Sequence, residues 1–174
     1  MICSEDVGLR PVVESDLPAL AQWWDKGCEG PMFFSLALMS EAALRNWLKG
    51  LLVDGTRMRL MVQVLAGGVT VGIIGLEHID YRNQSAELAG LMIDPLTRGH
   101  GWGTHAARAL IRYAFEDLNL CRLAARIPIS SHAPQRVAEK AGFTREGIAR
   151  QALLHNGDFE DVVFMSILRE EWKT

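Results

Sequence analysis

The sequence has little that points to an exported or membrane-spanning protein. Its three cysteines, Cys3, Cys28 and Cys121, lie far apart, and an odd number cannot form a complete set of intrachain disulfides. No apolar run approaches the length of about 18 residues that a spanning helix needs. The N-terminus also lacks the basic and apolar regions of a signal peptide. We therefore expect a cytoplasmic protein with reduced thiols and no membrane contact.

A strong charge of one sign is also absent, because 18 Lys and Arg stand against 21 Asp and Glu, a net charge of −3. Proteins that bind nucleic acid usually have a basic face that neutralises phosphates, so we expect no nucleic-acid partner. The cysteine spacings match no metal site, so we expect no metal. The length of 174 residues suits a single domain, 1–174, for which a homodimer is a reasonable default.

Helical and strand patterns alternate along the chain. The predicted order is a strand, two amphipathic helices, three antiparallel strands, a helix, a strand, a short helix and a final hairpin. The expected fold class is therefore α/β, with a mixed, mostly antiparallel sheet and helices on both faces. The predicted elements span 8–13, 16–27, 40–51, 60–65, 69–79, 87–93, 102–118, 123–127, 134–140, 143–154 and 159–168.

A glycine-rich segment lies between the third central strand and the long helix. Residues 98–104 read Arg-Gly-His-Gly-Trp-Gly-Thr. Helix N-termini have backbone N–H groups without partners and the positive end of the helix dipole, and the two together bind anions such as a pyrophosphate. Glycines allow the backbone to approach the anion closely, while Arg98 can add a charged donor and Thr104 a hydroxyl. The segment predicts a phosphate-binding turn, with a purely structural turn as the alternative.

Two other phosphate motifs do not fit this segment. A Walker loop requires Gly-Lys-Ser/Thr, which is absent. A dinucleotide-binding fingerprint that begins at Gly99 requires Gly or Ala where Thr104 stands. That fingerprint also needs an acidic residue about 20 positions later, and none occurs at 120–123.

Three segments resemble one known family. Residues 98–103 fit the pattern Arg/Gln-x-x-Gly-x-Gly/Ala. Residues 87–95 look like the strand that precedes that loop in the family, and residues 135–143 like its short helix ending in Gly-Phe. From about residue 69 onward the chain resembles the GNAT superfamily of acyl-CoA N-acyltransferases, most of all the branch that includes ribosomal-protein N-terminal acetyltransferases.

The resemblance implies a GNAT-like fold with acetyl-CoA (coenzyme A) as co-substrate. The acceptor would be an amine, either a small molecule or a protein N-terminus, attacking the thioester directly in a ternary complex. By the resemblance, the backbone of Leu91, Met92 and Ile93 would bind the pantetheine arm. The residues implied to hold the pyrophosphate are Arg98, Gly99, His100, Gly101, Trp102, Gly103 and Thr104.

The chain departs from this branch at 131–134, where Asn-x-x-Ser is common. The Asn contacts CoA in the branch, which makes Ser131 a candidate CoA contact here. Pro134 replaces the serine that can protonate the departing thiolate, and proline has no donor. Ser130, Ser131 or a water would have to serve as the acid, although a thiolate leaves readily enough for an acid to be dispensable. A CoA-binding sensor without turnover and an enzyme using a longer acyl-CoA therefore stay open as alternatives.

Glu87 is the candidate general base. At pH 7 a lysine-type amine costs roughly 4.6 kcal/mol to deprotonate and an α-amine about 1.4 kcal/mol, so a base is valuable. Strand alternation predicts that Glu87 shares a face with Leu91 and Ile93, whose apolar character would strengthen it as a base. The alternative is a solvated glutamate at a strand end.

Three further residues are candidate substrate contacts. His78 lies on the neighbouring strand and can titrate near neutrality; a histidine merely hydrogen-bonded on a sheet face is the alternative. Phe33 and Phe34 lie in the apolar segment 27–40 and would form a wall of the acceptor site. Ordinary core packing or a dimer contact is the alternative for both.

Overall fold

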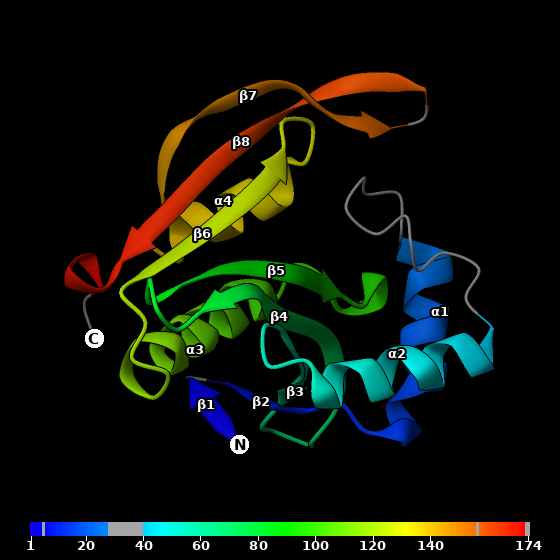
Figure 1. Ribbon diagram of the computed structural model, residues 1–174. Coiled ribbons are helices and arrows are strands. Elements are labelled where there is room, and N and C mark those ends of the chain that lie inside the picture. The colour runs from blue at the N-terminus through cyan, green and yellow to red at the C-terminus, as the bar shows by residue number, and fades with distance from the viewer. Residues whose placement is uncertain (5, 28–39, 156, 173–174) are drawn as a thin grey trace.

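The computed structural model describes residues 1–4, 6–27, 40–155 and 157–172, and its strands form one eight-stranded sheet (Figure 1). The strand order is β1-β2-β3-β4-β5-β6-β8-β7. Neighbouring strands are antiparallel except β5 and β6, which are parallel. The strands are β1 (Ile2–Ser4), β2 (Val7–Pro11), β3 (Met58–Val64), β4 (Thr70–Asp80), β5 (Ser85–Ile93), β6 (Arg122–Pro128), β7 (Thr144–His155) and β8 (Asp158–Leu168).

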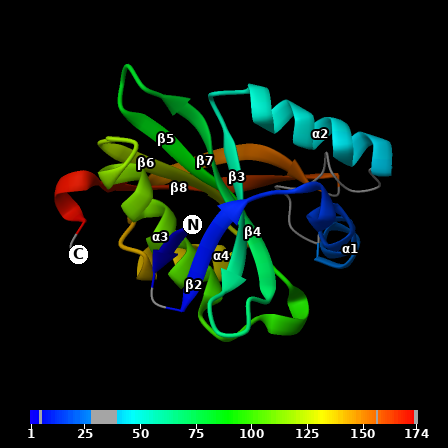
Figure 2. The same ribbon diagram turned by 90° about the horizontal axis from the view of Figure 1, so that it is seen from below.

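Helices cover both faces of this sheet (Figure 2). Helices α1 (Leu17–Gly27) and α2 (Glu41–Val53) pack on one face. Helices α3 (Trp102–Glu116) and α4 (His132–Lys140) pack on the other. Ser40 caps α2 by accepting a hydrogen bond from the Ala43 amide, as its position before an amphipathic segment predicts. The predicted mixed, mostly antiparallel sheet with helices on both faces is confirmed. None of the helices in the described ranges is long and apolar enough to cross a bilayer.

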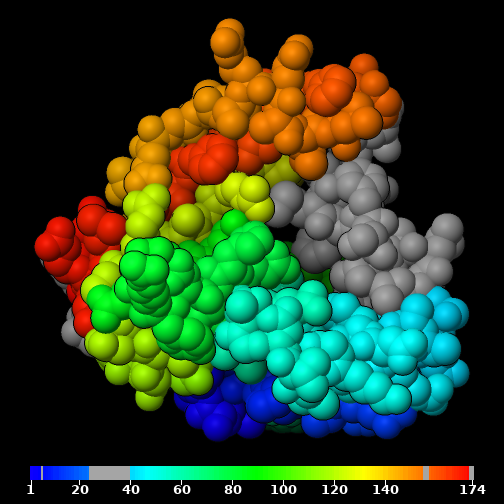
Figure 3. All heavy atoms as spheres, in the orientation of Figure 1, coloured from blue at the N-terminus to red at the C-terminus, as the bar shows by residue number. Residues whose placement is uncertain are grey.

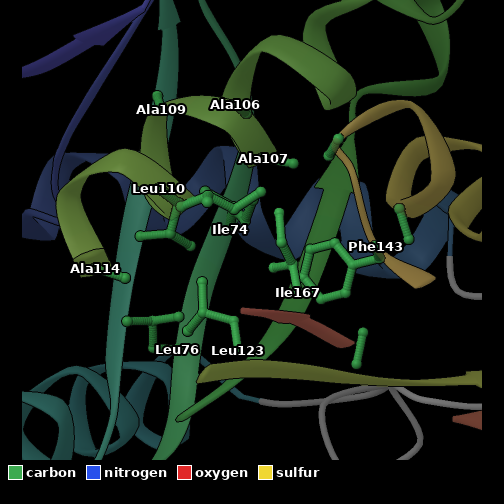
Figure 4. Close-up of a cluster of buried hydrophobic side chains, with 14 of the residues drawn as sticks. Ile74, Leu76, Ala106, Ala107, Ala109, Leu110, Ala114, Leu123, Phe143 and Ile167 are labelled. Atoms are coloured by element: carbon green, nitrogen blue, oxygen red, sulfur yellow. The ribbon is translucent and has the colours of Figure 1, made fainter. Parts of the chain in front are cut away.

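The main core lies between α3 and the centre of the sheet. The apolar stripe of α3 is buried at Ala107, Leu110, Ile111 and Ala114. Figure 4 shows Ala107, Leu110 and Ala114 of this helix beside labelled side chains of β4, β6 and β8. A second, smaller core joins α1 and α2 to the opposite face through Leu20, Trp23, Leu44, Met61, Ile73 and Met92. Burial of these side chains fixes both helix layers on the sheet.

The sheet divides at its centre. Strands β5 and β6 pair only over Ser85–Glu87 and Arg122–Ala124, after which they diverge (Figure 1). Strand β5 continues along β4 as far as Ile93, and β6 continues along β8 as far as Pro128. In Figure 3, β7 and β8 (orange to red) form the upper part of the surface and α2 (cyan) part of the lower. We call the point where the β5–β6 pairing ends the fork.

A β-bulge just beyond the fork changes which side chains share a face. Gly90 has a φ of +67°, and the β4–β5 register shifts between Ala89 and Met92. Leu91 therefore packs against the core under α3, whereas Met92 belongs to the core under α1 and α2. Because Ala86 and Leu88 also face the α3 side, Glu87 points the other way. The prediction that Glu87 shares a face with Leu91 and Ile93 is wrong, since the bulge breaks strict alternation.

At the start of β6, where this strand is still paired with β5, an ion pair joins it to the final hairpin. Arg122 donates to both carboxylate oxygens of Glu146 at 2.8 and 2.6 Å, and the Ser166 hydroxyl donates to the same carboxylate at 2.7 Å. The bonds from Arg122, followed by that from Ser166, lower the pKa of Glu146 from its ordinary value near 4.5 to about 2. A carboxyl group with a lowered pKa stabilises the folded state above its ordinary pKa, and this contribution is lost as the pH falls.

We expect acid to weaken the fold partly through Glu146. The contribution is present above pH 4.5 and lost as the pH falls toward 2. It amounts to no more than about 1 kcal/mol, because the pair is partly exposed and screened. Urea unfolding at about pH 6 and about pH 3 should therefore show a smaller loss of stability in Glu146→Gln than in wild type. Glu116→Gln, at an exposed position on α3, is the control. Equal acid sensitivity in wild type and Glu146→Gln would contradict this.

Candidate functional site

A cleft opens where β5 and β6 separate. Its volume is about 720 Å³, part of which is open to solvent. The lining is largely apolar and comes from β5, β6, α3, α4 and the start of the last hairpin. Arg126 and Ser131 are the polar side chains among the lining residues. These residues are Leu88, Ala89, Gly90, Leu91, Ala107, Ala125, Arg126, Ile127, Pro128, Ser131, Pro134, Val137, Ala138 and Phe143.

The edge of β5 that borders the cleft is open. Pairing with β6 ends at Glu87, so within the described residues the β6-facing edge of 88–93 has no strand partner. Such an edge offers main-chain N–H and C=O groups to an extended molecule with amide groups of its own. A side chain at Gly90 would meet the Arg59 guanidinium, since its Cβ would lie 2.8 Å from Arg59 Nε. The glycine therefore lets the strand bulge here over an arginine.

The three residues predicted to bind the pantetheine arm have different surroundings. Leu91 lines the cleft. The Met92 side chain is buried in the core on the opposite face, and the Ile93 carbonyl accepts a hydrogen bond from Arg98 Nε at 3.1 Å. Residues 88–90 also line the cleft, and the sequence analysis did not include them. The bulge could not be inferred from the sequence, although a lone glycine inside a strand pattern is its usual signal.

The turn at 98–104 has the backbone geometry of an anion site. Gly99 and Gly101 have φ values of +88° and +84°, and Gly101 is the N-cap of α3. Its carbonyl accepts from the amides of Thr104 and His105 at 2.9 and 3.1 Å. In the part of the chain that the structure describes, no acceptor is present for the N–H groups of residues 99–103. Free amides at the positive end of a 15-residue helix favour a bound anion.

Side chains of the turn form an aromatic surface beside these amides. The His100 ring stacks on the Trp102 indole with centroids 5.9 Å apart, and His105 meets the same indole edge-on at 6.1 Å. His100 Nδ1 lies 3.1 Å from the carbonyls of both Thr97 and Arg98, so Nδ1 carries the proton and donates. Arg98 folds back through its Nε toward Ile93. These contacts hold the turn in a single shape.

Glu87 lies at the fork within a group of charged side chains. It is buried, with 8% of its surface exposed. Arg126 Nε donates to both of its carboxylate oxygens at 3.0 and 3.1 Å, and His78 Nδ1 lies 3.3 Å from Oε2. The expectation of apolar neighbours is therefore wrong, because β6 supplies a guanidinium across the fork. The structure does bring His78 and Glu87 together.

A second ion pair lies beside the first. Glu77 is directly opposite Glu87 in the β4–β5 register, and Arg59 of β3 donates to Glu77. Each carboxylate in this part of the site therefore has a guanidinium partner. Neither Arg59 nor Arg126 was expected from the sequence as a site residue. The available signal was an arginine within an otherwise apolar strand, as in Leu-Ala-Ala-Arg-Ile at 123–127.

Helix α4 closes the cleft on the side of β6. Ser131 is its N-cap residue, and both Ser131 and Pro134 line the cleft. Gln135 Nε2 donates to the carbonyls of Pro128 and Ile129 at 3.1 and 2.9 Å, which ties the helix to the end of β6. The predicted acceptor-site residues Phe33 and Phe34 lie outside the described residues.

Comparison with known sequences places most of the chain in one family. Residues 6–144 match the model of the acetyltransferase (GNAT) domain. The putative ribosomal N-acetyltransferase YdaF of Bacillus subtilis (strain 168) is 39% identical over 110 residues, 63% of this chain and 60% of YdaF. The match thus spans less than two thirds of that relative. The spermidine N(1)-acetyltransferase of Escherichia coli (strain K12) is 24% identical over 99% of this chain and 91% of its own length.

Solved structures share the fold. A crystal structure of a probable acetyltransferase, 30% identical, has a TM-score of 0.83 and covers 97% of this chain and 96% of that one. The Vibrio cholerae spermidine N-acetyltransferase in complex with CoA and spermine has a TM-score of 0.86 at 23% identity, covering 95% and 97%; at this identity the likeness concerns the fold. Since the family match includes the fork, the glycine turn and both helices beside the cleft, this chain belongs to the GNAT family of N-acetyltransferases.

Proposed function

We propose that this protein transfers the acetyl group of acetyl-CoA to a primary amine, which attacks the thioester directly. The observation that carries the proposal is the position of a buried carboxylate, Glu87, at the fork beside a cleft whose open strand edge leads toward free helix amides. Both reactants can thereby meet at one point of the sheet. Proximity of this kind supplies a large part of the rate enhancement in two-substrate reactions.

The donor half of the site fits the chemical groups of coenzyme A. The open edge of β5 at residues 88–91 offers hydrogen bonds to the amides of a pantetheine arm, and the apolar lining suits its hydrocarbon parts. The amides of residues 99–103 suit a pyrophosphate. Ser131 borders the same cleft and can add a hydroxyl contact. Bound there, acetyl-CoA would supply an activated acetyl group.

On the acceptor half, we assign the role of general base to Glu87. Its carboxylate lies on the sheet face opposite α3, next to the fork, where it can take the proton of an ammonium directly or through a water. His78, 3.3 Å from this carboxylate and largely exposed, is placed to contact the acceptor. Among the cleft-lining residues there is no cysteine to form an acyl intermediate, in keeping with direct transfer.

The charges near Glu87 favour an acceptor with a single amine. Glu77 and Glu87 are each paired with an arginine, so neither offers an unpaired carboxylate to a polycation. An α-amine also needs only about 1.4 kcal/mol for deprotonation at pH 7, against roughly 4.6 kcal/mol for an alkylamine. Among the relatives, one is named for a ribosomal substrate and another for spermidine. We infer that this chain prefers an α-amine such as a peptide N-terminus.

The glycine turn gives a direct test of donor binding. A valine at position 101 would be strained at the φ of +84° by about 1–2 kcal/mol, and relief of that strain would turn the amides away from the anion. Gly101→Val should weaken binding of coenzyme A, measured by calorimetry, at least about ten-fold. Gly67→Val is the matched control, because Gly67 has a φ of +86° in the distant β3–β4 turn. Unchanged affinity in Gly101→Val would contradict the proposal.

Glu87→Gln should lower kcat/KM by about 10²- to 10⁴-fold, because the amide cannot accept the proton. Release of the CoA thiol with a panel of amines measures this, and calorimetry should show unchanged CoA affinity. The defect should shrink as the assay pH approaches the pKa of the amine, where less of it needs deprotonation. Full activity of Glu87→Gln would remove the assigned role. Tight CoA binding by wild type without thiol release for any amine would indicate a sensor instead.

The acceptor preference is tested with a short peptide that has one free α-amine and no lysine. At pH 7 we expect its kcat/KM to exceed that of spermidine at least about ten-fold, which follows from the cost of deprotonation. The same peptide with an acetylated N-terminus is the control and should release no thiol. A preference for spermidine would overturn the inferred class of acceptor while leaving the acetyl transfer itself intact.

A further inference from the structure

We propose that Arg126 is the positioning residue for Glu87, holding its carboxylate across the fork in the place that transfer requires. This inference rests on the proposed role of Glu87 as base. It assigns a function to a cleft residue that sequence motifs do not mark, because the two partners are 39 positions apart.

The position of the pair in the sheet is the first argument. Backbone pairing between β5 and β6 ends at Glu87 opposite Ala124. Arg126 lies two residues further along β6, so its side chain points to the same face as that of Ala124. The Glu87–Arg126 contact is thus the side-chain bridge that immediately follows the last backbone pair. It spans the two strands where they begin to separate.

The geometry of the contact is the second argument. One nitrogen, Nε, lies 3.0 and 3.1 Å from the two carboxylate oxygens, so its single N–H is shared between them. The backbone of Arg126 is itself held, because β6 pairs with β8 on both sides of it, at Ala125 and Ile127. Among the described residues no acceptor is present for the terminal nitrogens of Arg126, a residue that lines the cleft. Its guanidinium is therefore anchored to Glu87 through Nε alone.

The surrounding charges show what loss of Arg126 would do. Glu77 stands directly opposite Glu87 on β4 and is itself paired with Arg59 of β3. His78 on β4 is the other titratable contact of Glu87, and it is largely exposed. Without Arg126, Glu87 would be a buried carboxylate facing a second carboxylate. A buried carboxylate without a partner is costly, so the Glu87 side chain would leave the position that it holds beside Arg126.

The experiment compares Arg126→Met, Arg126→Lys, Glu87→Gln and the Glu87→Gln/Arg126→Met double variant. Arg126→Met keeps the length of the apolar stem but removes the charge. We expect it to lower kcat at least about ten-fold, while the KM for the amine and the CoA affinity stay within about two-fold. Arg126→Lys restores the charge and should recover part of kcat.

The double variant separates positioning from an independent role. If Arg126 acts through Glu87, adding Arg126→Met to Glu87→Gln should lower activity no further. A further fall by the full factor of the single variant, a raised KM with unchanged kcat, or a large loss of CoA affinity would each overturn the proposal. If Glu87→Gln has reduced activity but Arg126→Met has normal activity, only the role of Arg126 is overturned. Fully active Glu87→Gln would instead overturn the base assignment on which it rests.

Discussion

The site depends on the early end of the backbone pairing between β5 and β6. Three residue pairs join the strands, and each strand then follows a different neighbour, β5 along β4 and β6 along β8. A parallel ladder that ran the full length of both strands would satisfy the N–H and C=O groups of residues 88–93. Separation leaves that edge open, and α3 and α4 cover one face of the gap with apolar side chains. The open strand edge and the cleft therefore both result from the early end of the β5–β6 pairing.

Charged groups are arranged differently in the two halves of the site, the glycine turn and the fork. At the glycine turn, the proposed anion site consists of uncharged backbone amides at a helix N-terminus, and the nearby Arg98 is turned toward the carbonyl of Ile93. At the fork, charged groups are present but matched, Glu87 with Arg126 and Glu77 with Arg59. Buried charges are costly unless they are paired, so pairing keeps two acidic residues stable in neighbouring strands. The arrangement gives a local carboxylate without a broadly acidic surface.

Local patterns predicted the parts of the molecule that depend on local sequence. The helices expected at 40–51 and 102–118 and the glycine turn at 98–104 all follow from residues close together in the chain, and the structure has each of them. The element order was also correct, apart from the three-residue β1, which is too short to show a period. The neighbours of Glu87 could not be predicted. They depend on the bulge at Gly90 and on a partner from another strand, and both are set by register rather than by local sequence.

The narrow joint between the two parts of the sheet also has a mechanical consequence. Strands β1–β5 form one continuous antiparallel ladder and β6–β8 another, and the backbone link between them is three residue pairs wide. The two ladders diverge from this joint and behave as two rigid arms. A small angular change at Ser85–Glu87 displaces the far ends of β5 and β8 in proportion to their distance from it. Glu87 and Arg126 span the gap next to this joint, so a given change in the length of their contact corresponds to a larger angle between the strands than the same change further out.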